Sequence, residues 1–128
     1  MIGAGPIVCE LGQSFARLGA DVTIIASRDQ IMPKEEPEAA AVVQKQLESE
    51  GIRILTKSRA QRVEVIDGKK HLYIGDQKVV VDEILLSTGR VPNVGALGLE
   101  AAGVEVGKAG VKVNEKLQTN VKHIYGAG

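Results

Sequence analysis

Cysteine and aromatic side chains are scarce in this sequence. Its 128 residues include a single cysteine, Cys9, no tryptophan and only 2% aromatic residues. One cysteine cannot form an intrachain disulfide or a redox pair, and with two well-separated histidines it offers no cluster of metal ligands. We therefore expect no metal site, and we expect Cys9 to be a small buried residue of a helix.

Net charge and long apolar runs are lacking as well. Sixteen basic residues balance sixteen acidic ones, so there is neither a basic groove nor a set of aromatic rings on which nucleic-acid bases could stack. No apolar run approaches the roughly 20 residues that span a bilayer, and no signal-peptide pattern precedes the first glycines. The sequence therefore predicts a cytoplasmic globular domain without nucleic-acid or membrane partners.

Glycine is plentiful, and two glycines near the start form the main motif. Residues 1–2 lead into Gly3 and Gly5, and an apolar-periodic helix is expected from Pro6 to Leu18. Gly3 permits a turn that a side chain would not tolerate, whereas Gly5 lets the backbone approach a pyrophosphate closely. The free N–H groups at the helix start favour the same ligand. Val8 replaces the third glycine of such a fingerprint, so the helix is expected to stand slightly further from its strand.

The remaining segments define the fold class. We expect a strand at 21–26, a polar connection at 27–37, a helix at 38–50 and a strand at 52–56. Short alternating segments at 61–66, 71–74 and 79–81, with Asp67-Gly68 as a hairpin turn, predict antiparallel strands. A buried strand at 84–87 follows. The sequence thus predicts an α/β fold: a β-α-β-α-β parallel sheet with an antiparallel β-meander inserted before its last strand.

Four stretches resemble the flavin-dependent pyridine nucleotide-disulfide oxidoreductases, which include dihydrolipoamide dehydrogenase, glutathione reductase and mercuric reductase. The stretches are Gly3-Ala4-Gly5-Pro6-Ile7-Val8-Cys9-Glu10, Ile31-Met32-Pro33 with Glu36-Pro37-Glu38, Ser87-Thr88-Gly89-Arg90-Val91-Pro92-Asn93, and Ile124-Tyr125-Gly126-Ala127-Gly128. The resemblance implies a Rossmann-like NAD(P)-binding domain at residues 1–94 and a partial return of the flavin-binding domain at residues 95–128. It also implies a fragment whose first strand is truncated and whose parent enzyme, rather than the fragment, holds FAD.

The resemblance also implies a set of cofactor-binding residues and no catalytic residue. The set comprises Gly3, Ala4, Gly5, Pro6, Ile7, Glu10, Ser27, Arg28, Thr88, Gly89 and Arg90. In the family, a glutamate at the position of Glu10 lies near the nicotinamide, and the turn at 88–90 brings backbone close to the same end of the ligand.

The end of the second expected strand bears on the choice of nucleotide. An acidic residue there accepts hydrogen bonds from the adenosine ribose of NAD, whereas arginine pairs with the 2′-phosphate of NADP. This chain has Ala26 at the acid position, followed by Ser27 and Arg28, which favours NADP(H) over NAD(H). Asp29 remains an alternative, poorly placed acid.

Three functions follow as alternatives. The leading one is the NAD(P)H-binding portion of an oxidoreductase that passes hydride from NAD(P)H to FAD and on to a disulfide or related substrate, with the fragment itself binding dinucleotide at most. The second is a non-catalytic folding or association module with a disordered glycine loop. The third, a methyltransferase-like domain that binds S-adenosylmethionine, is disfavoured by the antiparallel strands and by the stretch at 88–93. Free strand edges at 111–113 and 124–125 also predict a tail that folds back or exchanges with a second copy to form a homodimer.

Overall fold

The computed structural model describes residues 1–127, and Gly128, the last residue of the fourth matching stretch, lies outside the described residues. The chain divides into two compact units, Met1–Gly89 and a second that begins at Arg90. The domain boundary predicted from the sequence lies nearby, at residue 94. The assignment of the two units to nucleotide-binding and flavin-binding domains stays a prediction.

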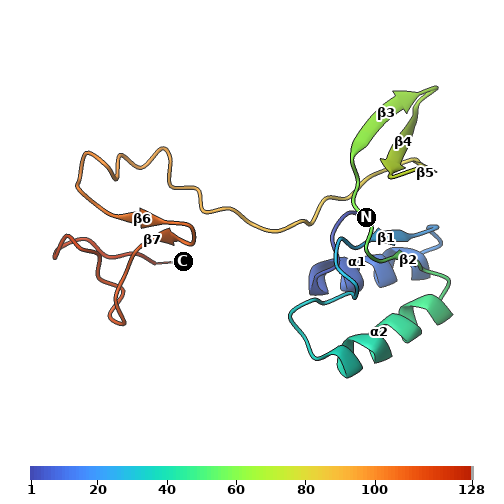
Figure 1. Ribbon diagram of the computed structural model, residues 1–128, viewed down its shortest axis with the longest axis horizontal. Coiled ribbons are helices and arrows are strands. Elements are labelled where there is room, and N and C mark those ends of the chain that lie inside the picture. Colours follow the sequence, from blue (N-terminus) through green and yellow to red (C-terminus); the bar gives the residue numbers. More distant parts are fainter. Residues whose placement is uncertain (128) are drawn as a thin grey trace. The chain divides into compact units, whose positions relative to one another are not determined.

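The first unit contains a short parallel sheet (Figure 1). Strand β1 (Thr23–Ile25) pairs with β2 (Arg53–Leu55) in parallel. On the other side of β1, Ile2 forms parallel bridges to Ile25 and to Leu86. The order across the sheet is therefore β2, β1, Ile2 and Leu86. Helix α1 connects Ile2 to β1 and helix α2 connects β1 to β2, so the predicted β-α-β-α-β topology is confirmed.

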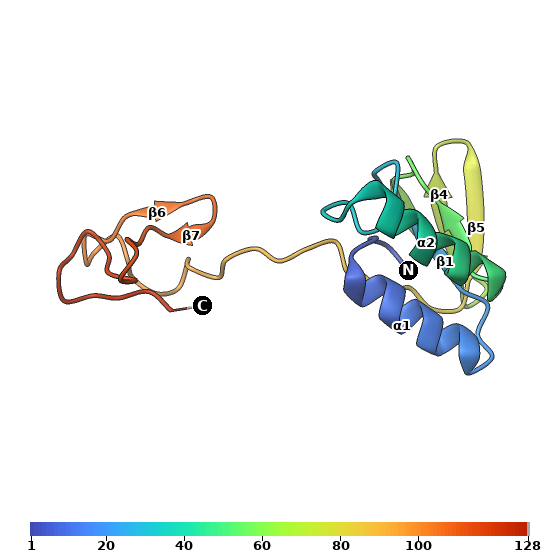
Figure 2. The same ribbon diagram turned by 90° about the horizontal axis from the view of Figure 1, so that it is seen from below.

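Both helices cover the same face of this sheet (Figures 1 and 2). Helix α1 (Pro6–Arg17) and helix α2 (Pro37–Ser49) each begin with proline, whose missing N–H costs nothing in the first turn. Glycines follow both helices, and Gly19 and Gly51 have φ of 97° and 86°, which terminates each helix in a left-handed turn. Both helices agree with the predicted ranges to within a residue or two. Within the described residues, no helix has the length and apolarity needed to cross a membrane.

An antiparallel meander covers the opposite face of the sheet. It comprises β3 (Arg62–Ile66), β4 (Lys69–Ile74) and β5 (Gln77–Val81), paired in the order β3-β4-β5. Asp67 and Gly68 both have positive φ, 51° and 77°, as a type I′ hairpin requires. The predicted hairpin and the predicted change from helices to antiparallel strands are confirmed.

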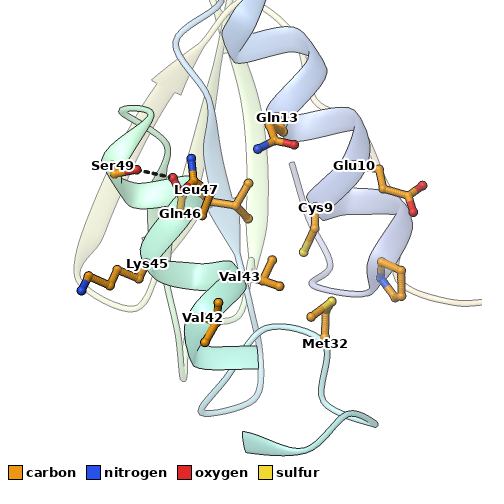
Figure 3. A pocket seen from close by; sticks show the side chains of 11 residues that line it. Cys9, Glu10, Gln13, Met32, Val42, Val43, Lys45, Gln46, Leu47 and Ser49 are labelled. Carbon is orange, nitrogen blue, oxygen red and sulfur yellow. Dashed lines mark hydrogen bonds between the residues drawn. The ribbon is translucent and has the colours of Figure 1, made fainter. Parts of the chain in front are cut away.

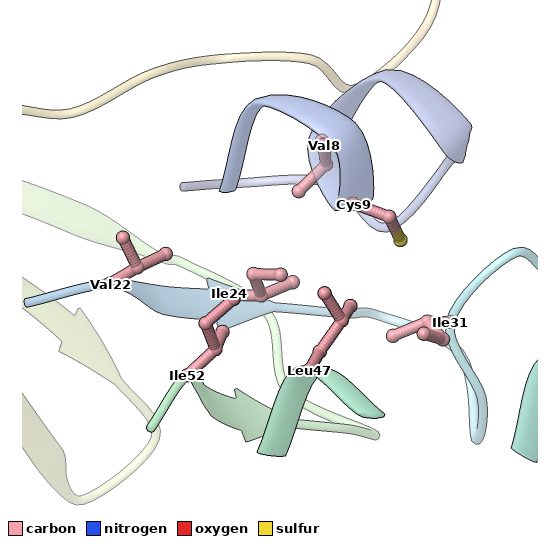
Figure 4. Close-up of a cluster of buried hydrophobic side chains, with 7 residues drawn as sticks. All are labelled: Val8, Cys9, Val22, Ile24, Ile31, Leu47 and Ile52. Carbon is pink, nitrogen blue, oxygen red and sulfur yellow. The ribbon is translucent and has the colours of Figure 1, made fainter. Parts of the chain in front are cut away.

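Two successive residues of β1 contribute to two different hydrophobic cores. Ile24 faces the helices and belongs to the larger cluster, drawn in Figure 4, whose buried members are Val8, Cys9, Val22, Ile24, Ile31, Leu47 and Ile52. Ile25 faces the meander and packs with Leu72 and Ile74. Because successive side chains of a strand point to opposite faces, one short strand anchors both layers.

Two predictions about burial were wrong. Ile31 lies in the connection predicted to be polar, yet it is fully buried in the helix-side core and fixes that connection to the sheet. The segment 84–87 was predicted to be a buried strand, but it forms only a bridge at Leu86, whose side chain is 70% exposed. Among the described residues, no further strand pairs with this edge, so Leu86 lacks the neighbour that would bury it.

The close approach of α1 to β1 occurs at Gly12, one turn beyond Val8. Val8 itself is fully buried, consistent with a packing role at that position. A Cβ at Gly12 would lie 3.3 Å from the Met1 Sδ and 3.4 Å from the Ile24 Cδ1. Glycine within a helix costs roughly 1 kcal/mol relative to alanine, so close packing explains its presence.

The second unit has its own short pairings. Strands β6 (Val106–Gly107) and β7 (Gly110–Val111) form an antiparallel hairpin, and Gln118 bridges to Tyr125. The side chain of Asn120 joins distant loops, because it accepts the Glu105 N–H at 2.9 Å and donates to the Gly103 carbonyl at 2.7 Å. These tail segments therefore find partners within their own unit, and the predicted homodimer stays a prediction.

We expect Gly3→Ala to destabilise the first unit severely. Gly3 has a φ of 123°, and a Cβ there would lie 2.2 Å from the Ser87 carbonyl oxygen. Strain of this kind costs roughly 3 kcal/mol or more, which lowers the Tm of a domain of this size by about 12 °C or more. Thermal unfolding by circular dichroism measures the effect.

Gly19→Ala is the matched control for that substitution. Gly19 also has a positive φ, but a Cβ there would meet no atom within 4 Å. Its cost should be the backbone strain alone, roughly 1 to 2 kcal/mol. Equal losses of Tm in the two variants would show that the clash with Ser87 adds nothing to the cost of the backbone strain.

A second prediction concerns acid stability and Glu50, which links the C-terminal ends of the two helices. Arg17 donates two hydrogen bonds to its carboxylate, at 2.7 and 2.8 Å, and Gln46 and Gln13 donate one each. The bonds from Arg17, followed by the one from Gln46, lower the pKa of Glu50 to about 2. A carboxyl with a lowered folded-state pKa stabilises the fold above its ordinary pKa and loses that contribution as the pH falls through the lowered value.

We therefore expect Glu50→Gln to be less stable than the parent at pH 7 and for the difference to shrink between about pH 4.5 and pH 2. Urea unfolding across this range measures it. Asp76→Asn, which removes an exposed carboxylate from the β4–β5 turn, is the control. A difference that is constant down to pH 2 would contradict this account.

Candidate functional site

The glycine turn is pressed against the segment that follows the meander. The Gly3 N–H donates to the Ile25 carbonyl at 3.0 Å, and the Ser87 N–H donates to the Ile2 carbonyl at 2.8 Å. These bonds hold Gly3 so close to Ser87 that no side chain fits between them. The predicted steric reason for glycine at position 3 is thereby confirmed.

Gly5 is different, because the fold itself does not require a glycine there. It precedes α1 with an ordinary extended backbone, φ −77° and ψ 176°, and a Cβ would meet no atom within 4 Å. No side chain caps the helix at this point. The N–H groups of Val8 and Cys9 bond to the Gly5 carbonyl, whereas that of Ile7 has no hydrogen-bond partner among the described residues. The helix start therefore presents bare backbone and a free donor.

A cleft of about 610 Å³ opens beside this turn, at the carboxyl ends of the parallel strands. Its lining residues all belong to the first unit; they are Ile2, Gly3, Ala4, Gly5, Ile25, Ser27, Arg28, Pro33, Ser58, Arg59, Ala60, Ser87, Thr88 and Gly89. No carboxylate is among them. In open α/β sheets, ligands bind at this edge of the sheet.

The far wall of the cleft is built by the loops that follow β1 and β2. The Lys57 N–H donates to the Arg28 carbonyl at 2.7 Å, and the Ser58 N–H donates to the Ala26 carbonyl at 2.9 Å. These backbone bonds hold the two loops side by side. Arg28 is a predicted site residue, whereas Arg59 is not. Arg59 follows the strand that pairs with β1, so the rule that neighbouring parallel strands end at the same edge could have identified it.

The structure brings together most of the predicted site residues. Gly3, Ala4, Gly5, Ser27, Arg28, Thr88 and Gly89 all line the cleft. Pro6 and Glu10 line a different groove, Ile7 is 59% exposed and lines neither, and Arg90 belongs to the second unit. Ala26 is fully buried, and Asp29 is not among the lining residues.

The other groove is larger, about 780 Å³, and lies between α1 and α2 (Figure 3). Apolar side chains such as Met32, Val42 and Val43 dominate its walls. Burial, and then the charge of Glu10, raise the pKa of the Cys9 thiol, so Cys9 is a packing residue rather than a reactive one. Neither an arginine nor the glycine turn at residues 3–5 lines this groove. We therefore place the candidate site at the smaller cleft.

Comparison with known proteins identifies the family of the chain. The family described as pyridine nucleotide-disulphide oxidoreductase matches residues 1–128. The whole chain is 40% identical to a dihydrolipoyl dehydrogenase of Bacillus subtilis and 38% identical to a mercuric reductase of Staphylococcus aureus. The matches cover 28% and 24% of those relatives, so the chain spans about a quarter of their length.

Solved structures of the same kind superpose closely. The HOCl-induced flavoprotein disulfide reductase RclA of Escherichia coli matches 97% of this chain over 29% of its own, with a TM-score of 0.90 and 26% identity. LpdA of Mycobacterium tuberculosis matches 99% of this chain over 28% of its own, with a TM-score of 0.90 and 30% identity. The chain therefore belongs to the pyridine nucleotide-disulphide oxidoreductase family, whose members use FAD and pyridine nucleotides.

Proposed function

We propose that the first unit binds a nicotinamide dinucleotide in the cleft, with the pyrophosphate against the turn from Gly3 to Gly5. The observation that carries this proposal is the open space at Gly5, where a glycine is present although the fold would accommodate a side chain. A bare backbone, a free Ile7 N–H and a helix N-terminus together suit an anion.

The remaining family-implied residues take roles around that ligand. Thr88 and Gly89 line the cleft beside the glycine turn, where their backbone would flank the nicotinamide end. The resemblance implies that Glu10 lies near the nicotinamide and that Arg90 lies at the crossing to the flavin domain. In this structure Glu10 lines the other groove and Arg90 belongs to the second unit, so these two roles rest on the resemblance alone. Pro6 and Ile7 contribute the rigid first turn of α1.

At the level of the whole enzyme, we propose that residues 1–94 are the NAD(P)H-binding domain and residues 95–128 part of the flavin-binding domain. In that enzyme NAD(P)H would supply a hydride to FAD, and the two electrons would then reduce a disulfide or related substrate, with protons taken from solvent. The residues described in the first unit bind and orient the dinucleotide, and we assign none of them a chemical step.

We further propose that the cleft prefers NADP(H) to NAD(H). The residue at the usual position of the ribose-binding acid, Ala26, is buried and has no side-chain acceptor. Ser27 and Arg28 follow it and line the cleft, whereas Asp29 does not. A hydroxyl and a guanidinium can both donate to a 2′-phosphate, which supports this preference.

The preference predicts the outcome of a calorimetric titration. NADPH should bind more tightly than NADH, and Arg28→Ala should weaken NADPH binding by about 10- to 100-fold, since a charge-assisted bond contributes roughly 1.5 to 3 kcal/mol. NADH binding should change by less than about threefold. Lys34→Ala, which removes a cation of the same connection outside the cleft lining, is the control. Tighter binding of NADH by the parent chain would refute the preference.

A second prediction separates binding from folding. Gly5→Val places a side chain in the open space before α1, so it should lower dinucleotide affinity by about tenfold or more while reducing stability by only about 1 kcal/mol. Thermal shift with and without NADPH measures both effects, because a ligand at 100 times its Kd stabilises by about 2.7 kcal/mol.

The same thermal scan tests the competing functions. A parent chain that neither nucleotide stabilises would favour the non-catalytic folding or association module. Stabilisation by S-adenosylmethionine instead of NADPH would favour the methyltransferase-like reading. Unchanged NADPH binding by Gly5→Val would place the pyrophosphate elsewhere.

A further inference from the structure

Two arginines from different strands share the cleft, and neither is neutralised there. Arg28 follows β1 and Arg59 follows β2, and both side chains are solvent-exposed lining residues. No salt bridge among the described residues involves either guanidinium, and the lining contains no carboxylate. Two like charges on one concave wall raise its positive potential, which an anion of higher charge would offset.

The backbone holds this pair in place. Lys57, two residues before Arg59, has a φ of 49°, which is uncommon for a residue with a side chain. Its N–H donates to the Arg28 carbonyl at 2.7 Å, so the left-handed turn before Arg59 is hydrogen-bonded to the backbone of Arg28. The Ser58 N–H bond to the Ala26 carbonyl, at 2.9 Å, adds a second link. The connection to Arg59 is thus set by the fold.

The order of the sheet shows which part of a dinucleotide Arg59 would meet. Ile2, which leads into the glycine turn, lies beside β1, and β2 lies on the far side of β1. Neighbouring strands are about 4.8 Å apart, so the loop of Arg59 starts about 10 Å across the sheet from the strand position of the glycine turn. Arg59 therefore lies beyond Arg28, away from the expected pyrophosphate and towards the adenosine end.

We propose that Arg59 is a second specificity-determining residue, which binds the phosphate on the 2′-oxygen of the adenosine ribose together with Arg28. This inference rests on the proposed dinucleotide function. A phosphate monoester carries a charge of about −1.5 to −2 at pH 7. One guanidinium neutralises only part of that charge, whereas two can each donate a pair of hydrogen bonds to its three free oxygens.

The test uses small nucleotides that differ only in the phosphate. Adenosine 2′,5′-bisphosphate and 5′-AMP are titrated by calorimetry into the parent chain and into Arg59→Ala. We expect the substitution to weaken the bisphosphate by about tenfold or more and AMP by less than about threefold. Arg53→Ala, which removes the exposed arginine of β2 outside the cleft, should change neither by more than about threefold.

Further variants separate direct contact from general attraction. Arg59→Lys keeps the charge but loses the paired geometry, so it should fall between the parent and Arg59→Ala for the bisphosphate. Adenosine 3′,5′-bisphosphate has the same charge, and we expect Arg59→Ala to affect it less than the 2′ isomer. An equal loss for the two isomers would overturn direct contact with the 2′-phosphate.

The outcomes also distinguish this inference from the function on which it rests. If the parent chain binds AMP and NADPH but Arg59→Ala weakens AMP and the 2′,5′-bisphosphate equally, or weakens neither, the inference fails and the proposed function stands. If the parent chain binds none of these nucleotides, both fail. A selective loss of the 2′,5′-bisphosphate supports both.

Discussion

The contact between the Gly3 backbone and the Ser87 carbonyl is the constraint on which the rest of the first unit depends. It places Ile2 between β1 and the segment at Leu86, so that a single residue completes the parallel ladder on both sides. Helix α1 begins three residues after Gly3, and its direction is therefore set by a turn that only glycine can make. The position of Ile2 in the sheet and the start of α1 both follow from this close approach.

The same register determines which loops meet. Because β1 and β2 pair in parallel with Ile24 opposite Ile54, their carboxyl ends lie side by side. The loop at Arg28 and the loop at Arg59 then share two backbone hydrogen bonds, although about 30 residues separate them in the chain. The loop at Arg28 therefore has the loop at Arg59 as its neighbour in space, which the sequence near Arg28 does not indicate.

Features that depend on local sequence could be predicted, whereas features that depend on which segments become neighbours in space could not. Gly3, the hairpin at Asp67 and the two helices could be predicted because turns, caps and periodicity are local properties. Arg59 and the packing of Gly12 could not be predicted from spacing alone, because each depends on which segments become neighbours in space. The exposure of Leu86 was missed because the sequence shows an apolar run but not the absence of a covering layer among the described residues.

The two glycines of the turn respond to different selective pressures. Position 3 is closed to side chains by the fold, so any descendant that still folds must keep a glycine there whatever it binds. The surrounding protein leaves open space at position 5, so under the proposed function only the bound nucleotide would exclude a side chain there. In a lineage that lost its nucleotide but kept this architecture, residue 5 would be free to drift while residue 3 stayed fixed. Under the proposed function, the residue at position 5 would therefore be constrained by nucleotide binding, whereas the residue at position 3 is constrained by folding.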